Sequence, residues 1–433
     1  MIFARTEYLK RLELTREDGL VKVVTGIRRA GKSFLLNELF YDALRESGVP
    51  EDHIIRFAFD SLDDRALIGA ELAADKKADG LKFLGWINEK LTGSGIYYIL
   101  LDEVQELENF EAVLNSLLRK RNVDIYVTGS NSRFLSGDIL TEFRGRGEEI
   151  HVFPLSFREY TAGMGLRPEE AWRDYVEIGG IPVVAGMRSR EQQYSYLRNL
   201  CDEVYLADIV ARNHVQNDAE LSELLDVTAS MMASVTNPTR ITNTFNAEKK
   251  RHLCDDTVYR YLKYFEDAFL LSRVKRFDVE GRRYINASYK FYFEDIGIRN
   301  ARLNFRQINE THIMENIIYN ELRMRGFQVD VGAVEIREKT DRRDKNGKYI
   351  YDRKQLEVDF VASRGAQKYY IQSAYAMPTA EKEEQEKKSL IHIQDSFQKI
   401  VLVKDDIHIR RDEDGVITMG VYDFLLHPDR LQL

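Results

Sequence analysis

The most constraining feature of this sequence is a short β-branched stretch, residues 20–25, that leads into Gly-x-x-x-x-Gly-Lys-Ser at residues 26–33. Valines favour a buried strand, and the apolar residues from Phe34 to Leu44 recur at helical spacing. Glycines let the backbone turn its N–H groups toward a phosphate chain, and the start of the helix adds the positive end of its dipole. A strand, a turn of this kind and a helix together predict a nucleoside triphosphate site.

Each position of this phosphate-binding loop has an expected partner. Lys32 is expected to reach the β- and γ-phosphates, and the Ser33 hydroxyl to bind Mg²⁺. Arg28 and Arg29 either contact phosphates as well or simply lie on an exposed face of the loop. The residues expected to bind ATP are Gly26, Ile27, Arg28, Arg29, Ala30, Gly31, Lys32, Ser33 and Phe34.

Strand and helix patterns alternate from residue 20 to residue 153. After the loop and its helix, strands are expected at residues 53–59, 96–101, 123–128 and about 149–153, and helical patterns cover much of 64–92 and 108–120. Strands that alternate with helices indicate a parallel sheet with helices on both faces. The predicted fold class is therefore α/β, with a sheet of the kind found in P-loop nucleoside triphosphatases.

Two carboxylates follow the apolar strand 96–101, at Asp102 and Glu103. In open α/β sheets ligands bind at the carboxyl edge, where these side chains would lie. We expect Asp102 to hold, through water, the Mg²⁺ that Ser33 also binds. Glu103 is placed to polarise the water that attacks the γ-phosphate. Acidic residues at strand ends are often only solvated termini, but their position after a phosphate-binding loop favours catalysis.

Two further elements after the next strand can complete the site. A polar residue there can help to fix the attacking water; Ser130 is the first candidate, with Thr128 and Asn131 close behind, although these residue types are also common in turns. Arg144 and Arg146 flank Gly145. Either arginine can reach the γ-phosphate of a neighbouring subunit, or be an ordinary surface residue.

Bulk properties exclude several classes of protein. The 433 residues are 44% hydrophobic and 31% charged, which indicates a globular chain. No stretch approaches the roughly 20 apolar residues of a membrane span, and the first residues do not have the pattern of a signal peptide. Cys201 and Cys254 are the two cysteines and have no metal-like spacing. We therefore expect a cytoplasmic protein with no membrane partner and no zinc or disulfide framework.

The chain beyond residue 153 divides into three further parts. A turn, an N-cap and a helix start at Pro154–Glu159 open a helical lid, residues 154–215, after the ATPase domain, residues 1–153. Residues 216–295 show three helical patterns and a hairpin, which is the winged-helix order. Residues 296–433 are α/β again, with a helix at about 311–325, strands at 328–336, 356–362, 368–374 and 399–404, and a helix at about 379–392. The charged segment 337–354 is expected to be a hairpin tip or a mobile loop.

These motifs resemble the AAA-type ATPases, and more narrowly a prokaryotic family whose loop reads Gly-x-Arg-Arg-x-Gly-Lys-Ser or Thr. In that family a Thr-Gly-Ser strand end, a Gly-Arg pair and Pro-Leu-Ser-Phe-x-Glu follow, as they do here at residues 128–130, 145–146 and 154–159. The second half resembles the module of unknown function that is usually fused to this ATPase, at 179–182, 292–297, Glu315 and 357–360. The resemblance implies a winged helix and a restriction-endonuclease-like fold, but no biological task.

A nuclease of that fold needs an acid on its first helix, an Asp on the second strand and Glu-x-Lys on the third, to hold Mg²⁺ and stabilise the attacking group. Glu315 and Asp359 match the first two positions, but Gln372 and Ala374 stand where Glu and Lys are expected. Because alanine cannot replace the lysine, we favour a degenerate domain with a structural or nucleic-acid-docking role over a competent nuclease.

Nucleic-acid binding depends on the predicted winged helix. Residues 249–283 contain ten Lys or Arg against six Asp or Glu, an excess that lies where DNA phosphates would contact such a domain. The net charge of −8 argues against general coating of nucleic acid. We predict Mg²⁺-dependent ATP hydrolysis coupled to a DNA- or protein-associated second half, in a possible homo-oligomer. The alternatives are an ATP-dependent switch with negligible turnover and an ATP-regulated, metal-dependent nuclease.

Overall fold

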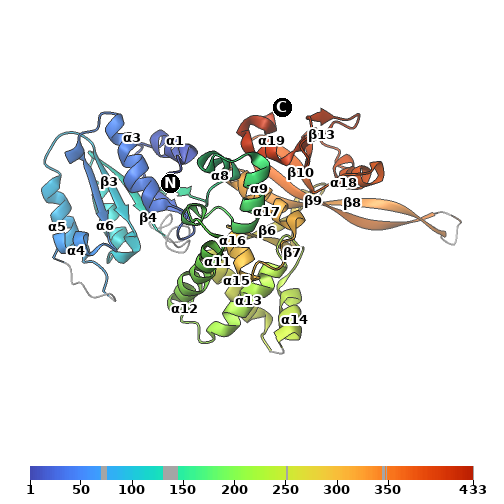
Figure 1. Cartoon of the computed structure of the whole chain (residues 1–433), viewed down its shortest axis with the longest axis horizontal. Helices are drawn as coiled ribbons and strands as arrows, with labels where there is room; N and C mark the ends of the chain where they lie inside the picture. Colours follow the sequence, from blue (N-terminus) through green and yellow to red (C-terminus); the bar gives the residue numbers. More distant parts are fainter. Residues whose placement is uncertain (70–75, 130–144, 250–251, 344–346, 348, 433) are drawn as a thin grey trace. The chain divides into compact units, whose positions relative to one another are not determined.

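The computed structural model describes residues 1–69, 76–129, 145–249, 252–343, 347 and 349–432 (Figure 1). The chain forms two compact units. Unit 1 contains Met1–Leu155, Ile181–Gly186 and Glu266–Leu270, and unit 2 contains Ser156–Gly180, Met187–Phe265 and Leu271–Leu433. Among the residues that the structure describes, no helix has both the length and the apolar character needed to cross a bilayer.

A parallel five-stranded sheet forms the centre of unit 1. Its strand order is β2-β3-β4-β1-β5, and every neighbouring pair is parallel. β1 and β3 are buried along their whole length, which explains why their sequences are continuously apolar rather than alternating. The α/β fold class predicted from the sequence is thus confirmed. The strands are β1 Val21–Thr25, β2 Ile54–Ala58, β3 Tyr97–Asp102, β4 Val123–Thr128 and β5 Gly147–His151.

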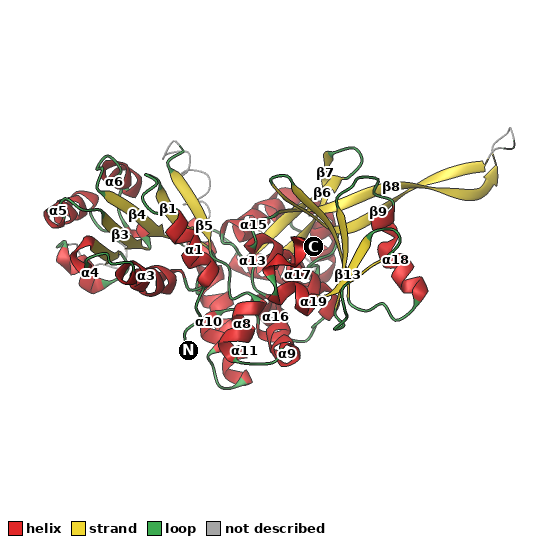
Figure 2. Ribbon diagram, turned by 90° about the horizontal axis from the view of Figure 1, so that it is seen from above, coloured by secondary structure: helices red, strands yellow, loops and turns green. Residues whose placement is uncertain are grey.

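Helices cover both faces of this sheet (Figure 2). On one face, α5 and α6 pack in one apolar cluster with alternate strand residues such as Ile99 and Leu101. On the other face, the Phe40 ring lies 4.7 Å from the ring of Tyr126. Phe40 ends a π-helical segment, Leu35–Phe40, that joins α2 to α3. The helices of unit 1 are α1 Thr6–Leu14, α2 Lys32–Phe34, α3 Tyr41–Glu46, α4 Leu62–Leu67, α5 Gly80–Lys90, α6 Phe110–Leu117 and α10 Pro182–Ala185.

Unit 2 begins with helices, as the sequence predicts. Ser156 caps α8: its hydroxyl accepts from the Glu159 N–H at 3.2 Å, and its own N–H donates to the Glu159 carboxylate at 2.9 Å. This capping box confirms the helix start predicted from Pro154–Glu159. The helices are α8 Phe157–Met164, α9 Pro168–Ile178, α11 Arg190–Asn199, α12 Ala207–Asn213, α13 Asp218–Ser230, α14 Pro238–Lys249, α15 Asp255–Asp267, α16 Ile296–Arg302, α17 Glu310–Met324, α18 Ala380–Ile391 and α19 Val421–Leu426; α15 ends in residues of unit 1.

An eight-stranded mixed sheet forms the rest of unit 2, in the order β12-β13-β11-β10-β9-β8-β6-β7. β6 and β7, the hairpin predicted within residues 216–295, lie in the same sheet as β8. The sheet therefore runs across the boundary predicted at residue 295, and the four domain limits stay predictions. The strands are β6 Leu271–Asp278, β7 Arg283–Phe293, β8 Gln328–Arg343, β9 Tyr349–Arg364, β10 Gln367–Ala374, β11 Gln398–Val403, β12 Arg410–Arg411 and β13 Val416–Gly420.

The β8–β9 hairpin is longer than the sequence predicts. Its strands pair as far as Arg343 and Tyr349, so much of the segment 337–354 is paired strand rather than loop. Figures 1 and 2 show the outer part of this hairpin extending beyond the other strands of the sheet.

Candidate nucleotide-binding site

The phosphate-binding loop joins the carboxyl end of β1 to the start of α2. Gly26 has φ +131°, and a Cβ atom there would lie 2.1 Å from the carbonyl oxygen of Val152, so a side chain cannot be accommodated. Gly31 has φ +95°, a conformation that glycine adopts without strain. Its carbonyl accepts a hydrogen bond from the Leu35 N–H at 2.9 Å. Both glycines of the motif are therefore required by the backbone path of the loop.

Lys32 is buried at the centre of this loop. Its ammonium donates to the carbonyl oxygens of Gly26 at 2.9 Å and Ile27 at 3.1 Å. The positive charge is thereby held against the loop, where the motif places bound phosphates. Arg29 and Phe34 are exposed and Arg28 is half-buried.

Ser33 and Asp102 come from segments far apart in the sequence, and the fold brings them together. The Ser33 hydroxyl donates to Asp102 Oδ1 at 3.1 Å, and the Thr128 hydroxyl also donates to that oxygen. Burial raises the pKa of Asp102 above its usual range, while the hydrogen bonds from Thr128 and Ser33 oppose that shift. A hydroxyl and a carboxylate in contact are oxygen donors that suit Mg²⁺. The residues present therefore fit the metal that the motif implies.

Glu103 lies one residue beyond this pair and is half-buried. Its backbone has φ +49°, and its N–H donates to the Thr128 hydroxyl at 3.0 Å. The Gln105 amide donates to the Glu103 carboxylate. Thr128 thus contacts both acidic residues, whereas Ser130, the first candidate from the sequence, lies outside the described residues together with Asn131. Gln105 is a contact that the sequence analysis missed, since a glutamine one turn after a strand gives no distinctive pattern.

Arg146 is not brought to the loop of its own chain. Its carbonyl accepts from the Val21 N–H at 2.9 Å, at the start of β1, and its side chain is exposed. The loop leaves β1 at the opposite end, after Thr25, and four residues of strand separate these ends by about 13 Å. Arg144 lies outside the described residues. Arg146 is therefore at the amino edge of the sheet, away from its own phosphate-binding loop.

Four residues beside the loop are absent from the sequence-based site. The Thr25 hydroxyl donates to the Glu149 carboxylate at 2.7 Å and lies 2.8 Å from His151 Nδ1. In addition, Cγ of Pro182, which opens α10, lies 3.8 Å from the position of a Cβ on Gly31. The sequence marks Pro182 as part of a family motif, but only the fold places it next to the phosphate-binding loop.

A second polar cluster lies inside unit 2, at the positions compared above with a nuclease. The ammonium of Lys290, on β7, lies 2.7 Å from Glu315 Oε1, 2.8 Å from Glu357 Oε1 and 3.3 Å from Asp359 Oδ1. The Tyr292 hydroxyl donates to the same Glu315 oxygen at 2.6 Å. We call Lys290, Glu315, Glu357 and Asp359 the lysine–carboxylate cluster.

The charges of this cluster are mutually dependent. Burial alone would lower the pKa of Lys290, but the carboxylates outweigh burial and raise it above its usual value. Burial raises the pKa of Glu315 to about 7, and Lys290 opposes that shift. Gln372 lies nearby, since its side-chain oxygen accepts from the Asp359 N–H at 3.4 Å. Ala374 is buried in an apolar cluster. The cluster therefore contains a cation, Lys290, although Gln372 and Ala374 stand where a nuclease of this fold has Glu and Lys.

The lysine–carboxylate cluster does not fit a divalent metal. The carboxylates that would bind the ion converge instead on the Lys290 ammonium. Within the described part of the chain, no group of three or more His, Cys, Asp or Glu side chains is arranged to hold a metal ion. The sequence analysis missed Lys290. The available signal was a charged residue within the run Tyr289–Phe293, which is otherwise aromatic.

Comparison with known proteins defines the class of unit 1. Residues 18–161 match the family described as an AAA domain, and residues 169–309 match a domain of unknown function, DUF8612. The chain therefore contains an AAA domain followed by a domain of unknown function, and the predicted resemblance is confirmed at this level.

Relatives of nearly the same length exist. An uncharacterized protein of Haemophilus influenzae is 29% identical over 431 residues, which cover 98% of this chain and 99% of the relative. The uncharacterized protein MJ1544 of Methanocaldococcus jannaschii is 24% identical over 379 residues, which cover 84% and 76% of the two chains.

Two solved structures are also similar to this chain. One is the ORC1 protein of Aeropyrum pernix in complex with DNA, with a TM-score of 0.34, 14% identity, and coverage of 70% of this chain and 93% of that chain. The other is Cdc6p of Pyrobaculum aerophilum, with a TM-score of 0.30, 11% identity, and coverage of 73% and 94%.

Proposed function

We propose that this protein is a cytoplasmic Mg²⁺-dependent ATPase whose nucleotide cycle is coupled to a DNA-associated second half. The observation that carries the ATPase proposal is the 3.1 Å hydrogen bond between Ser33 and Asp102. It puts a loop hydroxyl and a strand-end carboxylate side by side, next to a lysine held over the same loop. That combination serves the binding of a triphosphate with its metal.

In this proposal each residue has a separate task. Lys32 supplies positive charge to the β- and γ-phosphates from inside the loop. Mg²⁺, held by Ser33 and Asp102, offsets charge on the same phosphate oxygens when it is bound. Glu103 accepts a hydrogen bond from the attacking water and aligns it with the γ-phosphate. Thr128 fixes Glu103 and Asp102 relative to each other, since its hydroxyl contacts both.

The position of Arg146 supports a site completed by a second subunit. Because Arg146 lies at the amino edge of its own sheet, it is remote from its own loop but exposed to a neighbour. An arginine supplied by another subunit can stabilise the charge that develops on the γ-phosphate. We therefore propose a homo-oligomer in which Arg146, or Arg144 instead, acts in trans.

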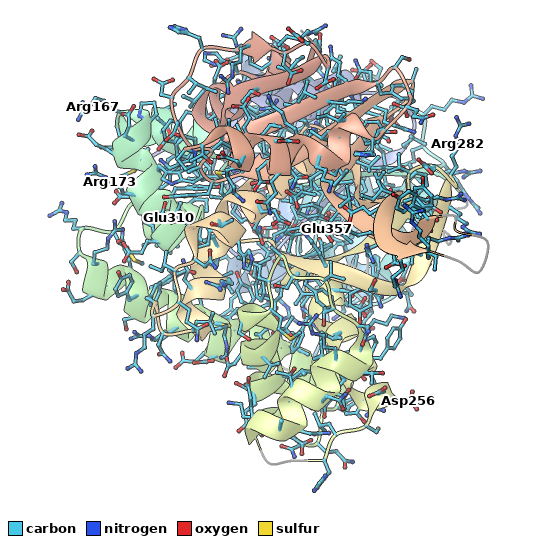
Figure 3. The ribbon with its side chains drawn as sticks, turned by 90° about the vertical axis from the view of Figure 1, so that its right-hand side faces the viewer. Arg167, Arg173, Asp256, Arg282, Glu310 and Glu357 are labelled. Carbon is cyan, nitrogen blue, oxygen red and sulfur yellow. The ribbon has the colours of Figure 1, made fainter. Side chains whose placement is uncertain are left out.

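The DNA-associated part of the proposal is carried by the helices and hairpin α13, α14, α15, β6 and β7, which follow the winged-helix order. Thr236, between α13 and α14, forms an isolated antiparallel β-bridge with Tyr289 of β7, at the place where that motif has a third short strand. Arg282 and Arg283 are exposed at the turn of the hairpin, and Figure 3 shows Arg282 at the outer edge of unit 2. DNA phosphates suit such basic side chains.

One contact favours a second candidate function, an ATP-dependent switch with negligible turnover. Gln105 donates to the Glu103 carboxylate and competes with a water for it. If this hydrogen bond persists with ATP bound, hydrolysis is slow and ATP acts mainly as a conformational signal. The nuclease alternative is not favoured, because Lys290 occupies the centre of the carboxylates that a catalytic metal would need.

The test separates binding from hydrolysis. Isothermal titration with a non-hydrolysable ATP analogue and a phosphate-release assay are applied to Lys32→Ala and Glu103→Gln. We expect Lys32→Ala to lose binding, and Glu103→Gln to keep binding and lose hydrolysis. Glu106→Gln, a half-buried acid in the same turn, is the matched control and should behave like the wild type. Unchanged hydrolysis in Glu103→Gln would refute the role of Glu103, and slow wild-type turnover with tight binding would favour the switch.

A further inference from the structure

The outer part of the β8–β9 hairpin, residues 337–343 and 349–354, is a two-stranded ribbon, which we call the arm. The six residue steps from Arg337 to Arg343 reach about 20 Å, and among the described strands Figures 1 and 2 show β9 alone alongside them. Tyr349–Lys354, on the returning strand, are all exposed. A two-stranded ribbon is marginally stable in water by itself. An arm of this kind therefore gains little from its own packing and is suited to contact with a partner.

The charge of the arm is opposite to that of the chain. Residues 337–354 contain eight Lys or Arg and four Asp or Glu, an excess of four positive charges, whereas the whole chain has a net charge of −8. Charge separation of this size indicates an anionic partner at the arm.

One face of the arm gathers arginines and tyrosines. Cross-strand partners share a face of a hairpin. The register pairs Arg337 with Arg353 and, beyond an irregularity between Lys339 and Arg343, it pairs Arg343 with Tyr349. Tyr351 lies between Tyr349 and Arg353 in the alternation and is therefore on the same side. The Arg343 guanidinium lies 4.4 Å from the centre of the Tyr349 ring. We call these five residues the arginine face.

The arginine face is poorly neutralised. The side chain of Arg353 is 70% exposed and pairs with Glu335 at 3.5 Å. Arg337 stands directly opposite Arg353, although like charges in that position destabilise a hairpin. Such an arrangement is favourable when an external anion lies across the two guanidinium groups.

The other face of the arm neutralises its own charges. Arg342 lies 2.7 Å from Asp352, and Lys354 lies 3.6 Å from Glu338. Lys388, from α18, also contacts Glu338 at 2.7 Å. The two faces of the ribbon therefore differ in degree: Arg342, Lys354 and Lys388 all contact acids on one face, whereas the ion pair of the arginine face is the 3.5 Å contact of Arg353 with Glu335.

We propose that the arginine face of the arm binds the phosphate backbone of double-stranded DNA. Guanidinium groups make bidentate contacts with phosphates, and tyrosine hydroxyls contribute to such interfaces. The major groove of B-DNA, about 12 Å wide, admits a two-stranded β-ribbon. The proposal extends the DNA-associated part of the proposed function to a surface separate from the winged helix, and it does not depend on ATP hydrolysis.

The experiment measures binding of the full chain, without nucleotide, to a fluorescein-labelled 30-base-pair duplex by fluorescence anisotropy between 50 and 200 mM KCl. The test variant is Arg337→Gln/Arg343→Gln/Arg353→Gln. The matched control removes three positive charges from the self-neutralised side, as Arg342→Gln/Lys354→Gln/Lys388→Gln.

We expect the test variant to bind roughly tenfold or more weakly at 100 mM KCl. The slope of log Kd against log salt should fall by about 1 for each phosphate that the variant no longer neutralises, so by up to about 3. The control should stay within about twofold of the wild type. The proposal is wrong if the test variant binds like the wild type, if the control loses as much affinity, or if the wild type binds no duplex.

A third variant separates this proposal from the winged-helix proposal. Arg260→Gln/Lys263→Gln neutralises the exposed side of α15 and leaves the arm unchanged. Loss of DNA affinity in this variant, with none in the arginine-face variant, would overturn the arm proposal and leave the proposed function standing. Loss in the arginine-face variant, with none in this one, would support the arm and count against the winged helix. If the arginine-face change abolishes self-association and the wild type ignores DNA, the partner is a second copy of the chain and the proposal fails.

Discussion

Replacement of Lys290 by alanine should convert a self-neutralised cluster into a divalent-metal site. In the wild type one ammonium lies 2.7–3.3 Å from Glu315, Glu357 and Asp359. Without it, the carboxylates face one another in a region from which water is largely excluded. Such a group is destabilised unless it takes up protons or another cation.

The loss of stability expected for Lys290→Ala follows from the burial of the acids that it leaves unpaired. Glu315 and Asp359 are each 6% exposed and cannot turn to water, whereas the Glu357 side chain is 31% exposed and can. Removing one partner of a buried ion pair costs about 3–5 kcal/mol. Lys290→Ala leaves two buried carboxylates without their cation, so its loss of stability should fall in the upper part of that range. For a unit of this size each kcal/mol lowers the midpoint by about 2–4 °C, so we expect a loss of about 8–20 °C.

Thermal unfolding of the full chain without nucleotide is the assay, in EDTA and then with Mn²⁺. Mn²⁺ at about one hundred times its Kd would return about 2.7 kcal/mol to Lys290→Ala. Lowering the pH should also reduce the deficit, because burial raises the pKa of Glu315 and the variant regains stability as this acid binds a proton. Lys275→Ala, an exposed lysine on the neighbouring strand, is the control and should change little.

Two results would refute this reasoning. The first is a Lys290→Ala protein within about 2 °C of the wild type, which would mean that the ion pairs contribute no net stability. The second is Mn²⁺ stabilisation of the wild type that disappears in Asp359→Asn. In that case the cluster would already bind metal, and Lys290 would be a partner of the metal site rather than its replacement.

Three further outcomes are expected. Arg146→Ala and Lys32→Ala should each be inactive alone but recover part of the ATPase activity when mixed, because mixed assemblies pair an intact loop with an intact arginine; no recovery, with activity independent of protein concentration, would indicate action in cis. The wild type should not cleave linear, nicked or single-stranded DNA in Mg²⁺ or Mn²⁺, and cleavage that disappears in Asp359→Ala would contradict this. Burial raises the pKa of Asp295 to about 6, above the unfolded value of about 3.9, so its ionisation lowers the stability of the fold by about 2 kcal/mol between pH 4 and pH 7. The unfolding midpoint of the wild type should therefore fall relative to that of Asp295→Asn as the pH rises from 4 to 7.

The fold of unit 1 could be predicted because its signals are local. Continuous apolar strands, amphipathic helices and a glycine-rich turn each leave a pattern within about fifteen residues, and β3, for example, is expected at residues 96–101 and forms at Tyr97–Asp102. β13 and α19 were not predicted. Val416–Gly420 is a five-residue strand, buried throughout and too short to show a period. Its identity as a strand depends on the parallel partner β11, which lies elsewhere in the sequence.

Some residues of the candidate site could likewise be predicted from local patterns, and others could not. Lys32, Ser33, Asp102 and Glu103 follow directly from motifs, because each lies at a strand end or in the loop itself. Gln105 and Pro182 could not be found, since their place beside the loop and its acids is fixed by tertiary packing. Lys290 is the most informative omission. The comparison with a nuclease sought a lysine on the strand of Gln372, whereas the lysine that contacts Glu315 and Asp359 lies on β7.

The motifs at residues 179–182 and 292–297 contact each other in the fold, and this contact explains why both are present. Asp295 accepts a hydrogen bond from the Gly180 N–H at 2.7 Å and from the Ile298 N–H at 3.0 Å, so one carboxylate holds a loop and caps α16. A Cβ on Gly179, which has φ +71°, would lie 2.4 Å from that carboxylate. Gly179 is thus required by the close approach of the buried acid, and this contact gives both motifs a structural reason.

Strand β9 connects the two features of unit 2 that the motifs did not reveal. It carries Arg353 of the arginine face and, a few residues further on, Glu357 and Asp359 of the lysine–carboxylate cluster. Lys290 therefore fixes the base of the strand whose outer part forms the arm. A two-stranded arm has little packing of its own to hold its direction, so its orientation depends on how firmly that base is held. A buried ion pair can serve this purpose even where it adds little net stability. If the arm binds DNA as we propose, Lys290 and its carboxylates serve to hold the base of the ribbon that makes the contact.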